Sequence, residues 1–487
     1  MLQAVQMVDK KQFITLCKTD PEEVYKLFCV MGETITTLKS QVVLLNEQVE
    51  TLQEEVKILK SRLDQNSCNS NKPPSSDEFI KPKSQRKKSG KKTGGQKGHQ
   101  GHTLKMSDNP DQIIIHRPKS CSGCGQELSR ELLGKTERRQ VFDIPLPKVE
   151  ITEHQSESVY CPCCGLLNKG SFPDEVNQPV QYGKGLLAQI IYLNQYQLIP
   201  YNRIAEYFAD LYSLKISEAT IFNALETIFE LLGPAEQATI SKLLKAKTLH
   251  VDETGMRVEG KRRWLHVVST AFYTNYNWHV KRGSIATKEI GILPRFKGTM
   301  VHDFWKPYYH YGCYHSLCNI HNIRELKGIF ELTGQKWPEE MIELLLKIKE
   351  RVDRGPLKEE EKTFFTESYD AIVSEGYRAN PPPKPTKKRG RPKKGRVLNM
   401  LGRLSEHRHE VLAFMEDFAV PFDNNQAERD IRMMKVKQKI SGVFRSAKGA
   451  DMFCRIRSYI STARKNSVSA FTAIADALDG RAFIPQV

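Results

Sequence analysis

The chain has 487 residues, of which 39% are hydrophobic and 9% aromatic, and its 74 Lys and Arg outnumber its 57 Asp and Glu to give a formal charge of +17. This length is too great for one simple core and predicts three or four modules, and the ordinary hydrophobic content excludes a wholly disordered or membrane-embedded chain. The positive surplus favours a polyanionic partner, most simply nucleic acid, although a basic surface without a specific partner would have the same net charge.

Residues 33–65 carry a regular heptad pattern, with apolar side chains at alternating spacings of three and four. Four of the five a positions are Ile or Val and every d position is Leu, which favours a parallel two-stranded coiled coil. A single amphipathic helix packing on its own domain is the alternative, but heptads without Gly or Pro favour self-association into a dimer or higher oligomer. The apolar positions are Ile35, Leu38, Val42, Leu45, Val49, Leu52, Val56, Leu59 and Leu63.

Residues 67–108 are rich in Pro, Ser, Gly and Lys and too poor in apolar side chains to form a core. This composition predicts a flexible basic arm that follows a phosphate backbone, with a plain solvated linker as the alternative. The first residues, 1–11, lack the apolar core of a secretory signal, so we expect a cytoplasmic protein. Eleven Cys in such a chain favour metal ligands and reduced thiols over disulfides.

Two matched Cys-x-x-Cys-Gly sequences, at 121–125 and 161–165, indicate a zinc ribbon within residues 109–175. Thiolates suit tetrahedral zinc, and the closing Gly lets the backbone turn beneath the metal. Residues 140–160 show strand-like alternation between the two sequences. Cys163 lies between the paired positions, and a set of four thiolates leaves no open position, so the zinc ion is expected to be structural. The shared frame selects as ligands Cys121, Cys124, Cys161 and Cys164.

Residues 184–245 have a helical pattern throughout. Within them, 203–212 and 217–229 form two amphipathic helices joined by a short turn, and Ser217 is a suitable N-cap for the second. The arrangement resembles a helix-turn-helix, in which one face of the second helix would meet the DNA major groove; an ordinary helical hairpin is an equal alternative. The residues on that face would be Ala219, Thr220 and Asn223.

From residue 246 the pattern changes to strands. The run Thr248–Asp252 is apolar and ends on a carboxylate, with Glu253 beside it and a Gly after it. A second short apolar run, Gly298–Asp303, also ends on a carboxylate, so two strands could place both acids at adjacent strand ends of one sheet. Residues 263–270 and 276–280 are expected to form further strands of an antiparallel meander.

A third acid, Glu428, falls one turn into a helix that Asp423 or Asn424 can cap. Cations cluster on and after this helix, which makes sense if they hold phosphates while the acid binds a metal ion. In-line attack on a phosphodiester uses two divalent ions roughly 4 Å apart, and hard Mg²⁺ or Mn²⁺ prefers carboxylate oxygen. The cations expected to contact phosphate are Lys435, Lys439 and Arg445.

The sequences L-H-V-D-E-T, H-D at 302–303 and V-P-F-D-N-N-Q-A-E-R-D-I-R-M-M-K resemble the DDE transposases of bacterial insertion sequences, and most closely the TnpC-type group, insertion-sequence sixty-six. The resemblance covers nearly the whole chain, and residues 420–465 are its most specific part. It implies an α/β multidomain protein whose catalytic domain has a ribonuclease-H-like fold with a helical insertion, and it implies Asp252, Asp303 and Glu428 as the ligands of two Mg²⁺ or Mn²⁺ ions. The family also suggests accessory proteins of the element as partners.

The segment between the second and third acids is far longer than a compact connection requires, and residues 335–375 within it have a helical pattern. Cys318 and His321 resemble a pair found near the second Asp in this family, with a structural role expected. Residues 381–396 are basic, and their R-G-R-P centre is similar to an AT-hook that fits a narrow minor groove; a basic surface loop is an equal alternative. The residues of this centre are Arg389, Gly390, Arg391 and Pro392.

The sequence therefore predicts a nucleoid-associated DNA transposase that binds element ends, frees 3′-hydroxyls and joins them to target DNA. The alternatives are a nuclease without strand transfer, a non-catalytic DNA-binding regulator, and, more weakly, an aspartic protease, for which D-E-T-G is the wrong turn and no second copy exists. The expected modules are a coiled coil at 1–66, the arm at 67–108, the ribbon at 109–175, a helical DNA-binding region at 176–245, a catalytic domain at 246–450 with an insertion at about 325–415, and a helical tail at 451–487.

Overall fold

The computed structural model describes residues 9–66, 68–70, 98, 104–128, 136–144, 147–382 and 395–485. Over these residues the protein is mixed α/β and divides into two compact units, each described here by itself. The first unit comprises Met1–Lys83, Leu244–Asp252 and Gly283–Glu428, and the second comprises Ser84–Leu243, Glu253–Arg282 and Arg429–Val487. Most of the predicted arm, and Arg389, Gly390, Arg391 and Pro392, lie outside the described residues.

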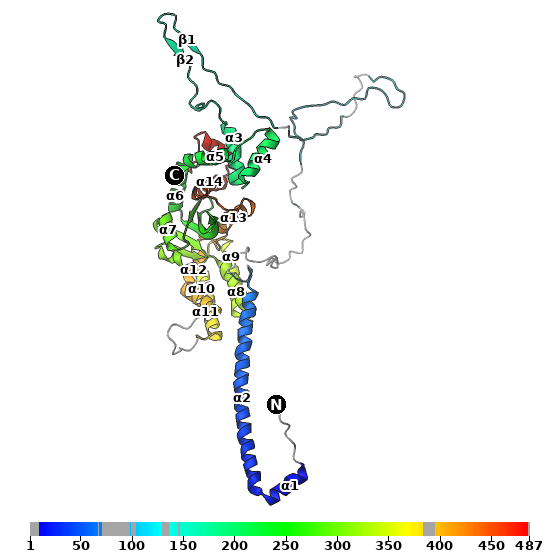
Figure 1. Ribbon diagram of the computed structural model, residues 1–487, viewed down its shortest axis with the longest axis vertical. Helices are drawn as coiled ribbons and strands as arrows, with labels where there is room; N and C mark the ends of the chain where they lie inside the picture. Colours follow the sequence, from blue (N-terminus) through cyan, green and yellow to red (C-terminus); the bar gives the residue numbers. More distant parts are fainter. Residues whose placement is uncertain are drawn as a thin grey trace. The chain divides into compact units, whose positions relative to one another are not determined.

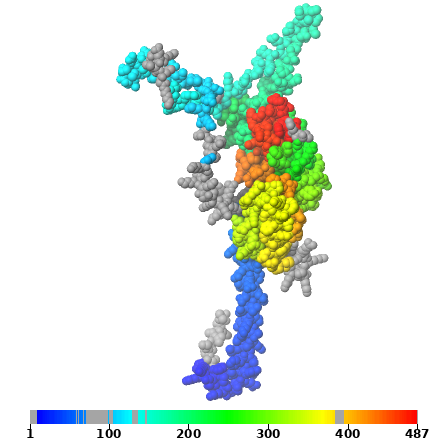
Figure 2. All heavy atoms as spheres, turned by 180° about the vertical axis from the view of Figure 1, so that it is seen from behind, coloured from blue at the N-terminus to red at the C-terminus, as the bar shows by residue number. Residues whose placement is uncertain are grey.

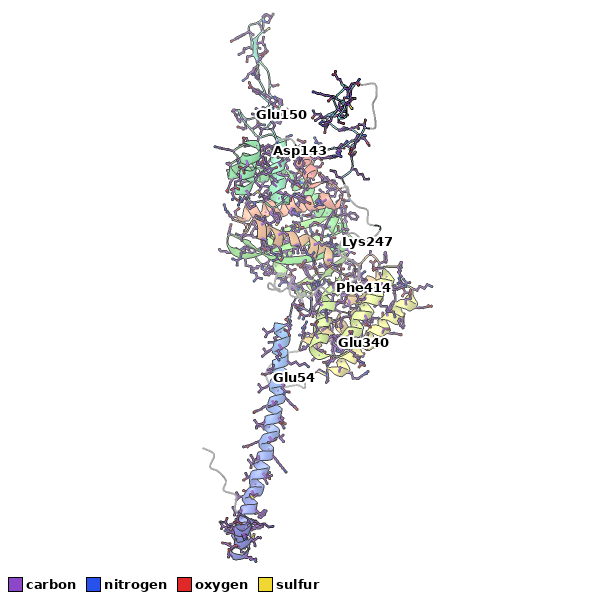
Figure 3. The ribbon with its side chains drawn as sticks, turned by 90° about the vertical axis from the view of Figure 1, so that its right-hand side faces the viewer. Glu54, Asp143, Glu150, Lys247, Glu340 and Phe414 are labelled. Atoms are coloured by element: carbon purple, nitrogen blue, oxygen red, sulfur yellow. The ribbon has the colours of Figure 1, made fainter. Side chains whose placement is uncertain are left out.

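The first unit begins with helix α1 (Lys10–Thr19) and the 43-residue helix α2 (Pro21–Leu63). The side chain of Asp20 caps α2 by accepting from the backbone N–H of Glu23 at 3.0 Å, and Pro21 suits the first helical position. Figure 1 shows α2 as one long uninterrupted helix, and Figure 3 shows its side chains, among them Glu54, projecting from it along its length. The nine apolar residues of the heptad seam are 48–84% exposed, so the predicted helix is confirmed while its pairing stays a prediction.

After α2 the chain turns at Asn66 and Cys68–Ser70, and this Asn69 turn contacts helices α8 (Asn319–Thr333) and α11 (Arg396–Glu406). Asn69 Nδ2 donates to Glu331 Oε2 at 2.9 Å, and Arg396 Nη2 donates to the carbonyl of Asn69 at 2.7 Å. A Cβ on Gly328 would lie 2.1 Å from that carbonyl oxygen, so only glycine allows the approach. The Asn69 turn is therefore fastened to the helices of the insertion.

Five strands form one sheet in the order β5-β4-β3-β6-β7. Strands β3, β6 and β7 are parallel, whereas β4 and β5 pair antiparallel as the meander predicts. Contrary to expectation, β3 does not end at Asp252 but continues to Val258, because Met256 and Val258 are also buried. The strands are β3 (Thr248–Val258), β4 (Lys261–Ser269), β5 (Thr274–His279), β6 (Thr299–His302) and β7 (Tyr314–Leu317).

The insertion is a helical body in the first unit with its own apolar core. In the space-filling view its atoms pack closely together (Figure 2). Trp337, Tyr369 and Phe414 are among its largest buried side chains, and Figure 3 places Phe414 within this body. The predicted helix 335–375 is confirmed as two helices, broken at 353–358 by Gly355 with a φ of 131°. The helices are α8, α9 (Trp337–Val352), α10 (Glu359–Ala379), α11 and α12 (Arg408–Glu416); the smaller α7 (Ser284–Ile290) precedes β6.

The second unit has a helical core that joins the predicted DNA-binding region to the C-terminal helices. Ile190, Ile221 and Ile456 are fully buried in it. Helix α14 also packs on β5, where Ser458 Oγ accepts from the N–H of Tyr276 at 2.8 Å. The helices are α3 (Lys184–Ile191), α4 (Tyr201–Tyr212), α5 (Glu218–Leu231), α6 (Gly233–Lys245), α14 (Ala447–Lys465) and α15 (Ala470–Leu478), so the helical prediction for 184–245 is confirmed.

The described residues of the cysteine-containing segment in the second unit include one short hairpin, β1 (Ser158–Tyr160) with β2 (Leu167–Lys169). The strand-like alternation predicted for 140–160 is wrong except in β1. Val141 and Ile151 are 92% and 89% exposed, so among the described residues no apolar layer lies beneath the alternating side chains to hold a strand. None of the helices in the described ranges is both long enough and apolar enough to cross a membrane.

Candidate active site

Two neighbouring parallel strands of the first unit carry the first two candidate acids. His250 of β3 pairs with Val301 of β6, and the register continued by two residues sets Asp252 level with Asp303. Parallel neighbours lie about 4.8 Å apart, and ligands of α/β sheets commonly bind at the carboxyl ends of such strands. Both acids are partly buried. The predicted adjacency of the two strands is confirmed.

The third acid is attached to β3 through Asn424, which precedes helix α13 (Asn425–Ile440) and is 2% exposed. Asn424 Nδ2 donates to the carbonyl of Val251 at 2.8 Å, and its Oδ1 accepts from Nδ1 of His250 at 2.9 Å. The carbonyl of Asn424 accepts from the N–H of Glu428 at 3.3 Å, which places Glu428 in the first turn. One buried amide therefore fixes the start of α13 against the strand that carries Asp252.

The next parallel strand, β7, leads into α8, where Cys318 is the residue before the helix and His321 lies in its first turn. Cys318 is 1% exposed and its Sγ accepts from the backbone N–H of Asn424 at 3.2 Å, so it packs α8 against the start of α13. His321 Nε2 lies 3.8 Å from Glu428 Oε1. Burial lowers the pKa of His321, while the charges of Asp303 and Glu428 act in the opposite direction, so His321 lies close to two of the three candidate acids.

The donor chemistry of Asp252, Asp303 and Glu428 fits Mg²⁺ or Mn²⁺, since all three offer hard carboxylate oxygen. His321 Nδ1 is buried without a hydrogen-bond partner, as a polar atom lining a site for a further ligand would be. Throughout the described part of the chain, no three His, Cys, Asp or Glu side chains are gathered closely enough to hold a metal ion. The strands and α13 thus supply suitable acids, whose side-chain oxygens do not form a closed cage.

Glu253, the acid beside Asp252, has a different environment. Its side chain is 1% exposed, and its Oε1 accepts from Nε and Nη2 of Arg282 at 2.9 and 2.6 Å. A carboxylate that accepts two hydrogen bonds from one guanidinium is committed to that ion pair.

The three predicted phosphate-contacting cations lie on or after α13 in the second unit. Lys435 is partly buried, with Nζ donating to the carbonyl of Gly255 at 3.3 Å. Lys439 is exposed, and the Arg445 side chain is 93% exposed, with only a 3.9 Å approach to Glu218. All three can therefore be reached from solvent to different extents.

The two cysteine sequences form nearly identical turns, as their matched spacing predicts. The N–H of Gly125 donates to the carbonyl of Cys121, and that of Gly165 to the carbonyl of Cys161, each at 2.9 Å. Both glycines have a φ above 70°, the left-handed region that the turn requires. Backbone N–H groups of Gly123 and Cys124 lower the pKa of Cys121, and those of Cys164 and Cys163 lower the pKa of Cys161. Each turn therefore favours thiolate, the form that binds zinc.

The two helices of the predicted helix-turn-helix are present in the second unit as α4 and α5. Ser217 caps α5 by accepting from the N–H of Thr220 at 3.0 Å. Ala219 and Asn223 are exposed and Thr220 is partly exposed, so the predicted face of α5 is accessible.

Sequence reasoning missed two features. The sequence predicts Asn424 only as a helix cap, because no local pattern indicates its hydrogen bond to a strand more than 170 residues earlier. Arg262 and Arg282, which both lie over the ring of Trp264, were also missed, although the alternation Arg-x-Trp in a strand places Arg262 and Trp264 on one face.

Acids on adjacent parallel strands, paired cysteine turns and a strongly basic chain together fit a transposase, a class of protein that acts on DNA. A family model described as "Transposase IS66 family" matches residues 179–452, and one described as "zinc-finger binding domain of transposase IS66" matches residues 118–165. A "Family of unknown function (DUF6444)" matches residues 29–105. No curated protein matches the chain. Because the first model covers more than half of its residues, the chain belongs to the IS66 family of transposases.

Proposed function

We propose that the chain cleaves insertion-sequence ends to free 3′-hydroxyls and joins these to target DNA by two-metal phosphoryl transfer in a ribonuclease-H-like domain. The observation that carries this proposal is the placement of three acids from separate segments. Asp252 and Asp303 are level on adjacent parallel strands, and Asn424 fastens the first turn of the Glu428 helix to the same strand as Asp252. Three independent segments converging in this way match the needs of phosphodiester chemistry.

Asp252, Asp303 and Glu428 would hold two Mg²⁺ or Mn²⁺ ions, which when bound supply an activated water or hydroxyl and stabilise the leaving oxygen. His321 lies 3.8 Å from Glu428, and burial lowers the pKa of its imidazole. It would position the Glu428 carboxylate.

DNA would be held by several parts of the chain. Lys435, Lys439 and Arg445 would contact phosphates, and α5 would present Asn223 and its neighbours to the major groove. The zinc ribbon, with Cys121, Cys124, Cys161 and Cys164 on one structural zinc ion, would add a further DNA-binding module. The arm at 67–108 and the R-G-R-P segment would follow the backbone and a minor groove, and the complex would be found with the nucleoid.

A coiled coil through α2 would pair two copies and bring two element ends together. The seam offers an apolar stripe that is largely exposed along the helix, which a second copy of the same helix would cover. Accessory proteins of the element would join this assembly.

The deciding experiment incubates purified protein with end-labelled element DNA and Mg²⁺. We expect nicks that expose 3′-hydroxyls, followed by products joined to a target plasmid, and we expect chelation to stop both. Asp252→Ala should abolish cleavage while leaving DNA binding intact. Full cleavage by that variant would remove the triad assignment, nicks without joined products would indicate a nuclease, and DNA binding without cleavage would indicate a regulator.

A further inference from the structure

A cluster of cations surrounds one tryptophan of strand β4 in the second unit. The guanidinium carbons of Arg262 and Arg282 lie 4.7 and 4.9 Å from the ring centre of Trp264. An indole attracts a guanidinium by cation–π interaction. Stacking on the ring also fixes the plane in which the guanidinium N–H groups lie. Trp264 therefore fixes two arginines that would otherwise sample many rotamers.

The cluster extends to the backbone of Gly255 in β3. Lys435 Nζ and Gln438 Nε2 both donate to the carbonyl of Gly255 at 3.3 Å. A Cβ on Gly255 would lie 3.8 Å from Nε of Arg262, so the arginine passes beside the same residue. Burial, and secondly the charge of Arg262, lower the pKa of Lys435. Arg262 and Lys435 are thus close enough for their charges to repel.

Ion pairs offset only part of this charge. Arg282 pairs with Glu253 and its side chain remains 43% exposed, while neither Arg262 nor Lys435 has a carboxylate within 4 Å among the described residues. Like charges held together beside an apolar ring destabilise the protein unless a bound anion neutralises them. Guanidinium forks match phosphate oxygens, which makes a phosphate the anion that this geometry suits best.

We propose that Arg262, Arg282 and Lys435, ordered by Trp264, form a seat for backbone phosphates of the DNA on which the chain acts. The seat rests on the proposed function for the identity of the DNA, but its contacts with phosphate need no base sequence. Glu253 holds Arg282 in place by its ion pair and takes no part in DNA contact. Sequence selection would reside elsewhere in the chain.

The test measures binding of a mixed-sequence DNA duplex as a function of salt concentration. Each lost phosphate contact lowers the slope of log K against log salt by about 0.9. We expect that loss for Arg262→Ala, and for Trp264→Leu a smaller loss because the charge remains while its orientation relaxes. Arg262→Lys keeps the charge but not the fork, so it should retain most of the slope and bind more weakly. Melting temperatures establish that each variant is folded.

Arg263→Ala is the matched control, because it removes the same charge from the adjacent residue on the opposite face of β4. Its slope should equal that of the natural sequence. Equal losses for Arg262→Ala and Arg263→Ala, or no loss for Arg262→Ala, would overturn the seat. Failure of the proposed function has a different signature, since a protein that binds DNA through Arg262 but never cleaves it in Mg²⁺ would retain the seat and lose the transposase chemistry.

Discussion

Asn424→Ala tests how the candidate active site is assembled. The side chain of Asn424 bridges the carbonyl of Val251 and the ring of His250, and both bonds are lost with the amide. Each neutral hydrogen bond contributes about 1 kcal/mol net, and removing a buried donor from the Val251 carbonyl adds about 1–3 kcal/mol. We therefore expect the free energy of unfolding to fall by about 3–5 kcal/mol.

The effect on cleavage should exceed what the loss of folded protein explains. Glu428 lies in the first turn of α13, which begins directly after Asn424. A loosened helix start therefore displaces the carboxylate, and displacement by about 1 Å costs about 100-fold in rate. Urea unfolding measures the free energy of unfolding. Cleavage of labelled DNA in the absence of urea, at equal concentrations of folded protein, measures the rate. A variant with natural stability and natural rate would refute the reasoning.

Asn425→Ala is the control for Asn424→Ala. Its amide donates to Asp423 Oδ2 at 2.6 Å, two residues away, rather than to β3. We expect its unfolding free energy and cleavage rate to change far less. Equal effects of the two substitutions would mean that the loop before α13, rather than the bridge to β3, controls the site.

Three further predictions concern other parts of the chain. Replacing Cys121 and Cys124 together by Ser should remove bound zinc, measured by metal analysis, because one half of the ligand set is lost. Leu45→Glu should give monomers in light scattering because it places a charge in the heptad seam, whereas Val43→Glu, outside the seam, should not. Gly328→Ala should raise hydrogen exchange around the Asn69 turn and cost about 1–3 kcal/mol by overpacking, since its Cβ would overlap the carbonyl of that turn.

Each of these predictions has a matched control. Cys163→Ser should keep zinc, because Cys163 lies outside the shared frame of the two turns. Gly185→Ala adds the same methyl group to another helix where nothing lies within 4 Å, so it should not destabilise the protein. Unchanged zinc in the double Cys variant would remove the ribbon, a dimeric Leu45→Glu would remove the coiled coil, and unchanged exchange in Gly328→Ala would remove the docking of the Asn69 turn.

Local patterns predict the helices and the adjacency of the two strands that carry Asp252 and Asp303. The heptad of α2 and the N-cap at Ser217 depend on neighbours within a few residues, and both helices form as expected. The two apolar runs before Asp252 and Asp303 likewise become neighbouring strands. The length of β3 could not be obtained in this way, because Thr254 and Gly255 interrupt the apolar pattern while pairing and burial carry the strand onward to Val258.

Local sequence patterns do not predict the polar contacts between residues that are far apart in the chain. Asn424 meets Val251, Asn69 meets Glu331, and Arg282 meets both Glu253 and Trp264. In each case a polar side chain has no periodicity that identifies its partner, and its burial or stacking becomes visible only when the elements pack. A polar residue beside a predicted site therefore merits mutation even where its local role looks ordinary.

The proposed zinc ribbon shows the same division within one module. Each cysteine turn closes through bonds between residues four or five apart, so each forms from local sequence alone. Joining the two turns must order the intervening chain, where Val141, Ile144 and Ile151 are largely exposed and offer little apolar burial to offset the lost entropy. Binding of zinc by thiolates can supply that free energy, because metal affinity for such a site is folding free energy. Zinc should therefore protect the amides of residues 147–157 from hydrogen exchange in the full-length protein, and protection that is equal with and without zinc would show that packing alone orders the module.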